Sequence, residues 1–464
     1  MRYVAVDLGA SNGRVIVGTL ENQRIELEEI WRFENKPISL HGRMFWDFLS
    51  LFDNVKTGLK LAFTKYGGEI ASIGVDTWGV DYGLIDKNGH LISNPICYRD
   101  SRTKGMVEKL MEIIDKGELY QRTGLQTMEI NTLFQLLSSV TNEPEMLQYA
   151  DKLLFMPDLF NYFLTGKAVN EYTEATTSQL FNPKDKNWEL GLFEALGIPM
   201  LMQDLVFPPT LLGMLSPHLA DELGGNAQVV AVGSHDTASA VVAANTPGVA
   251  FISSGTWSLM GVKIDNPILT TTALEKDFSN EGIVMGKIGF LKNITGLWLL
   301  QSLVREWKDL GSWVSYESLL DDASRSTCMS TIDVDDARLV NPVRMSDVIT
   351  QICRETGQVI PESMADYAML VCRSLARKYS DVKQELEMCI ASKINTIQII
   401  GGGSQNELLN RLTAEICDCE VIAGPIEATA IGNILTQAIG MGDINVDSID
   451  VILNNSFQLR SYNP

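Results

Sequence analysis

The residues best suited to chemistry lie in short polar loops that follow apolar runs, and the first such loop is near the N-terminus. Residues 4–6 are apolar, Asp7 follows, residues 9–14 read Gly-Ala-Ser-Asn-Gly-Arg, and residues 15–18 form a second β-prone run. Two such runs joined by a short loop rich in Gly and Asn predict a β-hairpin. The loop suits phosphate, because glycines let backbone N–H groups turn toward an anion and Arg14 adds a positive charge. Asp7 at the strand end is placed to hold a Mg²⁺ ion through water, and an ordinary hairpin at the start of a domain is the alternative.

A second loop, Gly-Ser-His-Asp-Thr at residues 233–237, follows the apolar run 228–232. Phosphoryl transfer requires positioning, donors for the transferred group, a metal ion and a carboxylate that takes the alcohol proton. Asp236 fits the last role, and His235 and Thr237 beside it would hold neighbouring hydroxyls. The alternative is that Asp236 caps the helix predicted after it.

Two further loops of this kind lie in the second half of the chain. The apolar run 249–252, the small polar loop 253–256 and a second apolar run repeat the pattern of the opening. This repetition indicates a duplicated architecture with a second phosphate loop. Residues 396–400 predict a buried strand that runs into Gly-Gly-Gly-Ser-Gln-Asn at 401–406 and then into a helix over 407–417. A strand, a glycine run and a helix N-terminus make a natural seat for a nucleotide, although the spacing is not that of a Walker P-loop.

The segment Asp-Thr-Trp-Gly-Val-Asp at residues 76–81 stands at the end of a predicted strand, where α/β folds usually bind ligands. The face of Trp78 would pack against the C–H side of a sugar, and Gly79 would let the backbone approach a ligand. A turn with a core tryptophan is the alternative. Residues 98–102, Tyr-Arg-Asp-Ser-Arg, predict either an ion-pair network at the edge of a pocket or the start of a solvated helix.

The elements that must position these loops alternate in type. Three strands near the N-terminus are followed by a helix with apolar residues at helical spacing over 47–66 and by a strand over 71–75. This order predicts an α/β fold with parallel pairing across the helix. Residues 245–248, Asn-Thr-Pro-Gly, mark the predicted boundary between an N-terminal domain, 1–245, and a C-terminal domain, 246–464.

Three later stretches complete the prediction. Residues 105–162 are predicted to be mainly helical, and the last long helix, from residue 427, has small residues that allow close packing against a neighbour. A long amphipathic helix is predicted over 362–392. Asn293 precedes a predicted helix over 297–310 and is placed to cap it.

The composition excludes two classes of partner. The 464 residues carry a formal net charge of -21, a field that repels nucleic acid and anionic membranes. The seven cysteines show no metal-binding spacing, and no apolar run approaches the roughly 18 residues that a membrane helix needs. We therefore expect a cytoplasmic protein with reduced thiols, a monomer or small homo-oligomer, that binds small molecules.

Taken together, these loops resemble those of the FGGY carbohydrate kinases. The resemblance rests on several motifs that occur in the family's order: residues 7–14, 233–237, 254–258 and 401–406. Within the family, residues 76–81, 98–103 and 293–301 are most similar to the members that act on L-rhamnulose.

The resemblance implies an α/β fold of two actin-like (ribonuclease-H-like, ASKHA) domains with a catalytic cleft between them. It implies ATP-dependent phosphorylation of O1 of L-rhamnulose, with Mg²⁺, in L-rhamnose breakdown. It makes Asp236 the proton acceptor and places Asp7 near the metal. The implied sugar contacts are Gly79, His235, Asp236, Thr237 and Asn293, and the implied ATP contacts are Ala10, Ser11, Asn12, Gly13, Arg14, Thr256, Gln301 and Gly402.

Two alternatives remain open beside this function. A kinase for another ketose, such as fuculose or xylulose, would differ only in a few sugar contacts. An actin-like nucleotide switch would share the phosphate hairpins but would need no sugar site. One departure from the family pattern is visible: some relatives carry a close cysteine pair after the glycine run, where this chain has Thr413 and Cys417.

Overall fold

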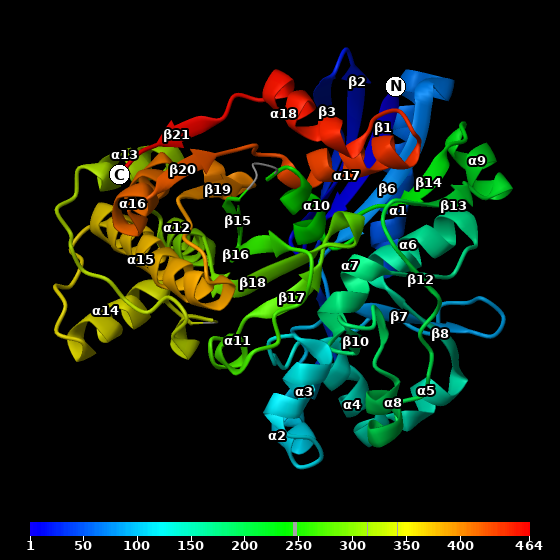
Figure 1. Cartoon of the computed structure of the whole chain (residues 1–464), viewed down its shortest axis with the longest axis horizontal. Helices are drawn as coiled ribbons and strands as arrows, with labels where there is room; N and C mark the ends of the chain where they lie inside the picture. Colours follow the sequence, from blue (N-terminus) through cyan, green and yellow to red (C-terminus); the bar gives the residue numbers. More distant parts are fainter. Residues whose placement is uncertain (245–247, 313, 341) are drawn as a thin grey trace. The chain divides into compact units, whose positions relative to one another are not determined.

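The computed structural model describes residues 1–464 except 245–247, 313 and 341, and its elements are labelled in Figure 1. The residues group into two compact units. The first comprises Met1–Asn245, Lys263–Phe290 and Ala428–Ser456, and the second comprises Thr246–Val262, Leu291–Glu427 and Phe457–Pro464. Residues 245–247, on which the predicted domain boundary falls, lie outside the described residues. The division into 1–245 and 246–464 stays a prediction.

The first unit is built on a six-stranded sheet with the order β13-β14-β6-β1-β2-β3. Its strands are β1 (Arg2–Leu8), β2 (Asn12–Glu21), β3 (Arg24–Glu34), β6 (Ile70–Thr77), β13 (Thr210–Met214) and β14 (Gln228–Ala231). β1, β2 and β3 are the three predicted N-terminal strands, and they form an antiparallel meander. β6 pairs parallel with β1, and β14 pairs parallel with β6, which confirms the pairing predicted across the first helix.

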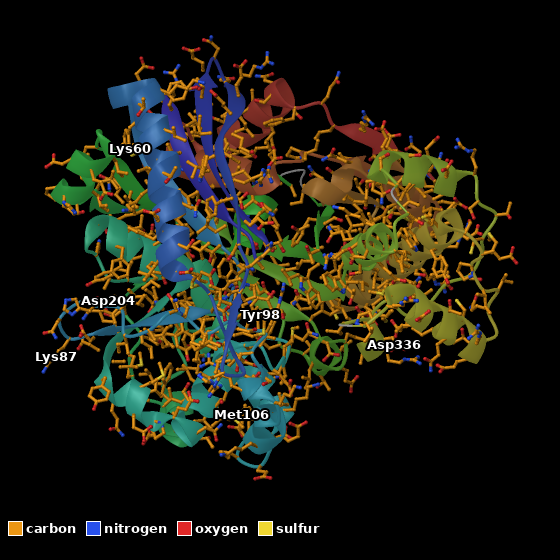
Figure 2. The ribbon with its side chains drawn as sticks, turned by 180° about the vertical axis from the view of Figure 1, so that it is seen from behind. Lys60, Lys87, Tyr98, Met106, Asp204 and Asp336 are labelled. Carbon is orange, nitrogen blue, oxygen red and sulfur yellow. The ribbon has the colours of Figure 1, made fainter. Side chains whose placement is uncertain are left out.

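The first helix, α1 (Phe48–Tyr66), is the amphipathic helix that the sequence predicted. Asp47 caps its N-terminus, because the Asp47 carboxylate accepts a hydrogen bond from the backbone N–H of Ser50. The buried apolar stripe runs from Phe48 to Phe63, while Lys60 on another face is exposed to solvent (Figure 2).

A helix from the end of the chain, α17 (Ala428–Gly440), returns to this sheet, where Figure 1 shows it beside β1. Gln437 Nε2 donates to the backbone oxygen of Val4 (3.0 Å), and Gln437 Oε1 accepts from Ser72 Oγ (2.7 Å). These bonds join α17 to β1 and β6. α17 also packs along α10 (Asp236–Val242), which follows β14.

A second core in the first unit surrounds β7 (Tyr82–Asp86) and β8 (Ala150–Phe155), which pair antiparallel. The prediction that residues 105–162 are mainly helical is confirmed, but it did not include the strand β8. Its partner strand lies far earlier in the chain, so local periodicity does not reveal the pairing. The helices of this stretch are α2 (Met106–Met111), α3 (Lys116–Thr123), α4 (Thr132–Asn142), α5 (Pro144–Tyr149) and α6 (Met156–Thr165).

Shorter elements complete the first unit. The strands are β4 (Ile38–Leu40), β5 (Arg43–Phe45), β9 (Asn170–Glu171), β10 (Phe181–Asn182), β11 (Asn187–Trp188), β12 (Leu205–Val206) and β17 (Ser279–Gly282). The helices are α7 (Tyr172–Ala175), α8 (Leu190–Leu196), α9 (Pro217–Leu223), α11 (Thr271–Glu275) and α18 (Ile449–Ser456).

The second unit contains a sheet in which β18, β16, β15, β19, β20 and β21 are neighbours in that order. The strands are β15 (Ala250–Ser254), β16 (Trp257–Ile264), β18 (Ile288–Thr295), β19 (Thr396–Ile400), β20 (Glu420–Ala423) and β21 (Arg460–Tyr462). The helices are α12 (Trp298–Asp309), α13 (Tyr316–Ser324), α14 (Met345–Glu355), α15 (Met364–Ile390) and α16 (Glu407–Cys417). β15 and β16 form the predicted second hairpin, and β15 pairs parallel with β19 as β1 does with β6. This repetition confirms the duplicated architecture.

Among the described helices, none combines the length and the apolar character that crossing a membrane requires.

The close approach of α17 to α10 gives a prediction about stability. A Cβ atom at Gly432 would lie 1.8 Å from the backbone oxygen of Ser239, so Gly432→Ala must push the two helices apart. We expect the free energy of unfolding to fall by at least about 1–3 kcal/mol, measured as a lower thermal midpoint. Gly68→Ala is the control, because a Cβ there meets no atom within 4 Å. Equal midpoints for the two variants would contradict the packing role of Gly432.

Candidate active site

The carboxyl ends of three parallel strands in the first unit bring the predicted acidic residues to one edge of the sheet. In the register of β1 and β6, Asp7 lies opposite Asp76. His235, soon after β14, forms a parallel bridge with Thr77. Asp236 is therefore carried to the same edge as Asp7 and Asp76, which is the edge where open α/β sheets bind ligands.

The acids at this edge influence one another. Burial raises the pKa of Asp236 to about 7, and the nearby negative charge of Asp7 adds to the increase. Burial also raises the pKa of Asp76 well above its usual value, with Asp7 contributing next. Asn433 on α17 partly offsets this effect by donating to Asp76 Oδ2 (2.6 Å). A carboxylate whose pKa lies near neutrality is well matched to accepting and releasing a proton.

Asp236 itself is the first residue of α10. The preceding residue, His235, occupies the N-cap position, so the interpretation of Asp236 as a helix cap is wrong. Asp236 Oδ1 accepts a hydrogen bond from Thr237 Oγ1 (3.2 Å). The side chain is 34% exposed, which leaves the carboxylate accessible to a substrate hydroxyl.

A buried acid that the sequence did not single out holds the backbone before Asp236. Glu171 caps α7, and its Oε2 accepts from the backbone N–H of Ser234 (3.3 Å). Thr173 Oγ1 donates to the same oxygen (2.5 Å) and accepts from the backbone N–H of His235 (3.1 Å). Burial raises the pKa of Glu171 to about 8. The start of α7 therefore fixes the loop that carries the candidate base.

The first predicted phosphate loop joins β1 to β2. Ser11 and Asn12 are exposed there, and Ala10 is half-buried. Arg14 lies opposite Asp7 in the hairpin, and its guanidinium forms an ion pair with the Asp7 carboxylate. Gly13 serves packing: a Cβ atom would lie 2.4 Å from the ring of Phe33, whereas its φ is not in the left-handed region. The hairpin therefore requires glycine at position 13 because a side chain would not fit there, and not because of the backbone conformation.

Trp78 belongs to the core of the first unit, which confirms the alternative interpretation of its segment. It is 5% exposed, and its ring lies 4.3 Å from the ring of Trp46. Both indole N–H groups donate to Asp81 Oδ2, at 3.0 Å from Trp78 and 2.6 Å from Trp46. Burial raises the pKa of Asp81 to about 6, and these hydrogen bonds oppose the increase. Trp78 and Asp81 thus support the turn between them.

Gly79 lies in a strained turn. Val80 has a φ of +70°, which a β-branched residue rarely adopts, and the backbone N–H of Asp81 donates to the oxygen of Gly79 (3.0 Å) in a γ-turn. The backbone N–H of Val80 donates to Thr177 Oγ1 (3.0 Å), and its oxygen accepts from Thr132 Oγ1 (2.7 Å). Such strain costs about 1–3 kcal/mol and persists only where the surroundings enforce it. The two threonines provide that support beside a predicted sugar-binding residue.

Residues 98–102 show features of both alternatives: Asp100 caps a short 3₁₀ helix that begins at Ser101, and its carboxylate is buried in an ion pair with Arg43. Asp100 is 4% exposed, accepts from the backbone N–H of Met44 (2.7 Å) and pairs with Arg43 (3.2 Å). Arg102 donates to Gln135 Oε1 (2.6 Å) and to Ser139 Oγ (3.4 Å).

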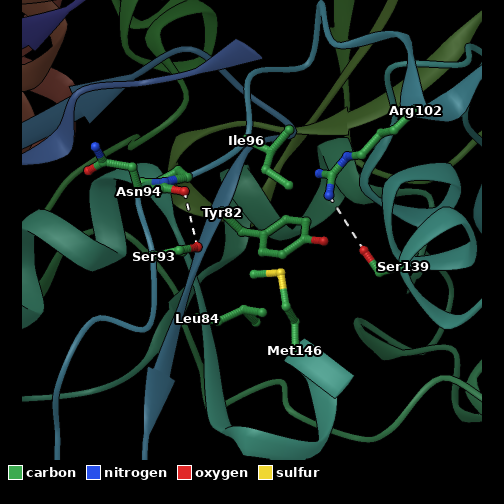
Figure 3. Close-up of a pocket in the computed structure, with 10 residues that line it drawn as sticks. Tyr82, Leu84, Ser93, Asn94, Ile96, Arg102, Ser139 and Met146 are labelled. Carbon is green, nitrogen blue, oxygen red and sulfur yellow. Dashed lines mark hydrogen bonds between the residues drawn. The ribbon is translucent and has the colours of Figure 1, made fainter. Parts of the chain in front are cut away.

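The bond from Arg102 to Ser139 closes one side of a pocket, shown in Figure 3, whose walls include Tyr82 and Met146. The residues predicted to bind sugar or ATP are not among those that line this pocket.

In the second unit, Thr256 lies in the loop between β15 and β16. Its backbone oxygen accepts from the backbone N–H of Trp298 at the start of α12 (3.2 Å). A Cβ atom at Gly296 would lie 2.6 Å from the backbone of Trp257, so the hairpin loop and the start of α12 are in close contact. Gln301 follows in α12 with an exposed side chain. Thr256 and Gln301 are therefore brought to one region.

The glycine-rich loop packs against the end of β15 in the same unit. Gly401 has a φ of +83°, and a Cβ atom at Gly403 would lie 2.0 Å from Ser254 Oγ. Gly402 between them is exposed, with no atom within 4 Å of a Cβ position. Asn406 caps α16 by accepting from the backbone N–H of Leu409 (3.0 Å). The loop leaves open space at Gly402, where a nucleotide could approach the backbone.

Asn293 does not cap α12, and that interpretation is wrong. The N-cap of α12 is Leu297, and Asn293 lies within β18, which continues to Thr295. Its side chain is half-buried. Its contact with the sugar stays a prediction.

The donor set near Asp7 suits a magnesium ion. Within the described part of the chain, no three His, Cys, Asp or Glu side chains converge into a complete metal site. Mg²⁺ usually binds through one or two carboxylates, with water and phosphate oxygens completing its shell. Asp7 lies in a group of acids, and the buried Oδ1 of Asp76 has no hydrogen-bond partner among the described residues. A metal cation beside Asp7 would add to the charge of Arg14, which already pairs with Asp7, in offsetting the repulsion between these acids.

Two acids beside the candidate base, Glu171 and Glu281, were missed by the sequence analysis. Glu281 lies on β17, and its Oε2 is 3.6 Å from His235 Nδ1. Neither acid belongs to a recognisable sequence motif. Both lie far from Asp236 in the sequence, and α7 and β17 approach Asp236 only in the folded chain.

The fold is that of two-domain carbohydrate kinases. The structure resembles that of a xylulose kinase from Lactobacillus acidophilus with a TM-score of 0.82 and 16% identity, covering 100% of this chain and 94% of that one. Two family models match the sequence: the N-terminal domain of the FGGY family of carbohydrate kinases over residues 2–243 and the C-terminal domain over residues 250–441. The chain belongs to the FGGY family of carbohydrate kinases.

Relatives within the family are similar over nearly the whole chain. A rhamnulokinase from Oceanobacillus iheyensis is 41% identical over 462 residues, which cover 99% of this chain and 97% of the relative. A rhamnulokinase from Bacteroides thetaiotaomicron is 42% identical over 468 residues, covering 100% of this chain and 96% of the relative.

The strained turn at Gly79 gives a prediction. Thr177→Val keeps the shape of the side chain but removes the oxygen that accepts the buried N–H of Val80. We expect the free energy of unfolding to fall by about 1–3 kcal/mol, seen as a lower thermal midpoint. Thr177→Ser keeps the acceptor and should remain close to the original protein. Equal midpoints for the valine and serine variants would show that the turn does not depend on this bond.

Proposed function

We propose that this protein transfers the γ-phosphoryl group of ATP to O1 of L-rhamnulose, giving L-rhamnulose 1-phosphate and ADP, as a step of L-rhamnose breakdown. Membership of the FGGY carbohydrate kinases supports the class of reaction. The rhamnulokinases at 41% and 42% identity support the choice of sugar. The observation that carries the chemistry is Asp236, an accessible acid with a raised pKa at the carboxyl ends of three parallel strands.

Asp236 is the proposed proton acceptor. As O1 of the sugar bonds to the γ-phosphorus, the O1 proton passes to the Asp236 carboxylate, and the bond from phosphorus to the leaving oxygen of ADP breaks. Asp236 then returns the proton to solvent, for which a pKa of about 7 is well suited. Gly79, His235, Thr237 and Asn293 would hold the other groups of the sugar.

ATP would be bound by residues of both units. In the first unit the hairpin residues Ala10, Ser11, Asn12, Gly13 and Arg14 would contact phosphate. The exposure of Ser11 and Asn12 supports this proposal. In the second unit the contacts would be Thr256, Gln301 and Gly402. Asp7 would hold Mg²⁺, which neutralises phosphate charge when bound.

A panel of ketoses tests this proposal. L-rhamnulose, L-fuculose and D-xylulose are compared at equal concentration in an assay of ADP release with Mg²⁺-ATP, and we expect the highest kcat/KM for L-rhamnulose. Asp236→Asn should retain ATP binding but lose about 10²–10⁴-fold in kcat. A preference for another ketose would overturn the sugar, and turnover by Asp236→Asn near the original rate would overturn the base. ATP hydrolysis that no ketose stimulates would favour a nucleotide switch.

The raised pKa of Asp236 predicts a pH dependence. Only the ionised carboxylate accepts the proton, and its fraction falls as the pH drops through a pKa of about 7. We expect kcat/KM for the sugar to fall about tenfold for each unit of pH well below 7 and to level off above it. Initial rates between pH 5.5 and 9 at saturating ATP measure this profile. A flat profile across that range would contradict the assignment.

A further inference from the structure

The ring of His235 lies between two carboxylates. His235 Nδ1 is 3.6 Å from Glu281 Oε2, and His235 Nε2 is 3.5 Å from Asp236 Oδ1. The His235 side chain is 11% exposed and the Glu281 side chain 8%. Both distances are longer than those of a normal hydrogen bond, so a side chain must rotate before either bond forms. Such contacts in a substrate-free active site often shorten when the substrate binds.

The supply of hydrogen-bond donors differs between the two acids. Asp236 receives hydrogen bonds from the backbone N–H and the hydroxyl of Thr237, and it reaches solvent. For Glu281, His235 is the one cationic or N–H partner that the described residues bring to its carboxylate. Burial raises the pKa of Glu281, and His235 opposes that increase. A hydrogen bond donated by Nδ1–H therefore stabilises the ionised Glu281 carboxylate, so the ring proton is needed more at Nδ1 than at Nε2.

Burial favours the neutral form of His235 and lowers its pKa, although Glu281 opposes this effect. A neutral imidazole carries one proton, so one ring nitrogen donates and the other accepts. If Nδ1 donates, Nε2 presents a lone pair on the side of Asp236. Two acceptors, Nε2 and the Asp236 carboxylate, then face one place, and a substrate with two hydroxyl groups supplies both donors.

We propose that Glu281 is a positioning residue that holds His235 as the Nδ1-protonated tautomer, so that Nε2 accepts a hydroxyl of the sugar beside the one that Asp236 deprotonates. This inference rests on the proposed sugar kinase function for its role in the reaction. Its structural part, the tautomer of His235, concerns the protein without substrate.

The strand that carries Glu281 is held firmly enough for such a role. On β17, the backbone N–H of Gly282 donates to Thr176 Oγ1 (2.7 Å). On the other side, Asn280 Nδ2 donates to the backbone oxygen of Gly124 (2.9 Å), and Ser279 Oγ accepts from the backbone N–H of Gln126 (3.0 Å). These contacts fix the residues on both sides of Glu281, so its carboxylate has a defined position relative to His235.

The first test is the tautomer of His235, read from ¹H–¹⁵N correlation spectra of the imidazole rings in the substrate-free protein. The chain has four histidines, and the His235 signals are assigned by their loss in His235→Asn. We expect Nδ1 in the protonated range and Nε2 in the unprotonated range at pH 7.5. Glu281→Gln, whose amide oxygen still accepts, should preserve this pattern, and Glu281→Leu should abolish it. An Nε2-protonated ring in the original protein would overturn the proposal, whether or not the protein phosphorylates a ketose.

The second test separates a positioning role from a merely structural one. Glu281→Leu should lower kcat/KM for the ketose about 10–100-fold through a higher KM, with the KM for ATP unchanged, and Glu281→Gln should restore most of the loss. Glu275→Leu on α11 is the matched control, because Glu275 is exposed. Equal kinetics for Glu281→Leu and the original protein would overturn the proposal. Should Glu281→Leu fail to fold, the glutamine variant and the spectrum of the original protein decide it. Absence of ketose phosphorylation by the original protein would instead count against the proposed function.

Discussion

The parallel pairing of β6 between β1 and β14 is the constraint on which the rest of the first unit depends. It sets Asp7 opposite Asp76 and brings His235 beside Thr77, so that residues from three distant segments share one edge of the sheet. A shift of register by one residue would turn each side chain to the opposite face of the sheet. The helices α1 and α17 cover the sheet and keep that register in place.

Gathering acids at one edge has an energetic cost that the surrounding structure offsets only in part. Asn433 donates to Asp76, Thr237 donates to Asp236, and Thr173 donates to Glu171. The remaining cost is expressed as raised pKa values, because desolvation and neighbouring negative charge both disfavour the ionised form. A general base that works near neutral pH requires such a shift. The arrangement that destabilises the acids therefore also gives Asp236 a pKa that fits its proposed role as a base.

Much of the fold and part of the candidate site could be predicted from the sequence. The two hairpins, α1, β19 and α16 follow from local patterns, because alternating or helical spacing of apolar residues depends only on nearby positions. Asp236 and the glycine-rich loops could be selected as candidate site residues from their residue types and from their positions after apolar strands. The reason for individual glycines was not predictable, since Gly13 and Gly403 make room for Phe33 and Ser254, which are distant in sequence.

By itself, the sequence determined where the loops predicted to bind ligands lie and what class of chemistry they could support, because residue types set which groups can donate, accept or carry charge. Only the tertiary structure decided the surroundings of those groups. It buried Trp78 in the core, placed Asn293 inside a strand, and brought Glu171 and Glu281 to the loop that carries Asp236. These outcomes depend on contacts between segments far apart in the chain. The pKa of a side chain and the tautomer of a histidine depend on the same contacts, so they too belong to the folded molecule.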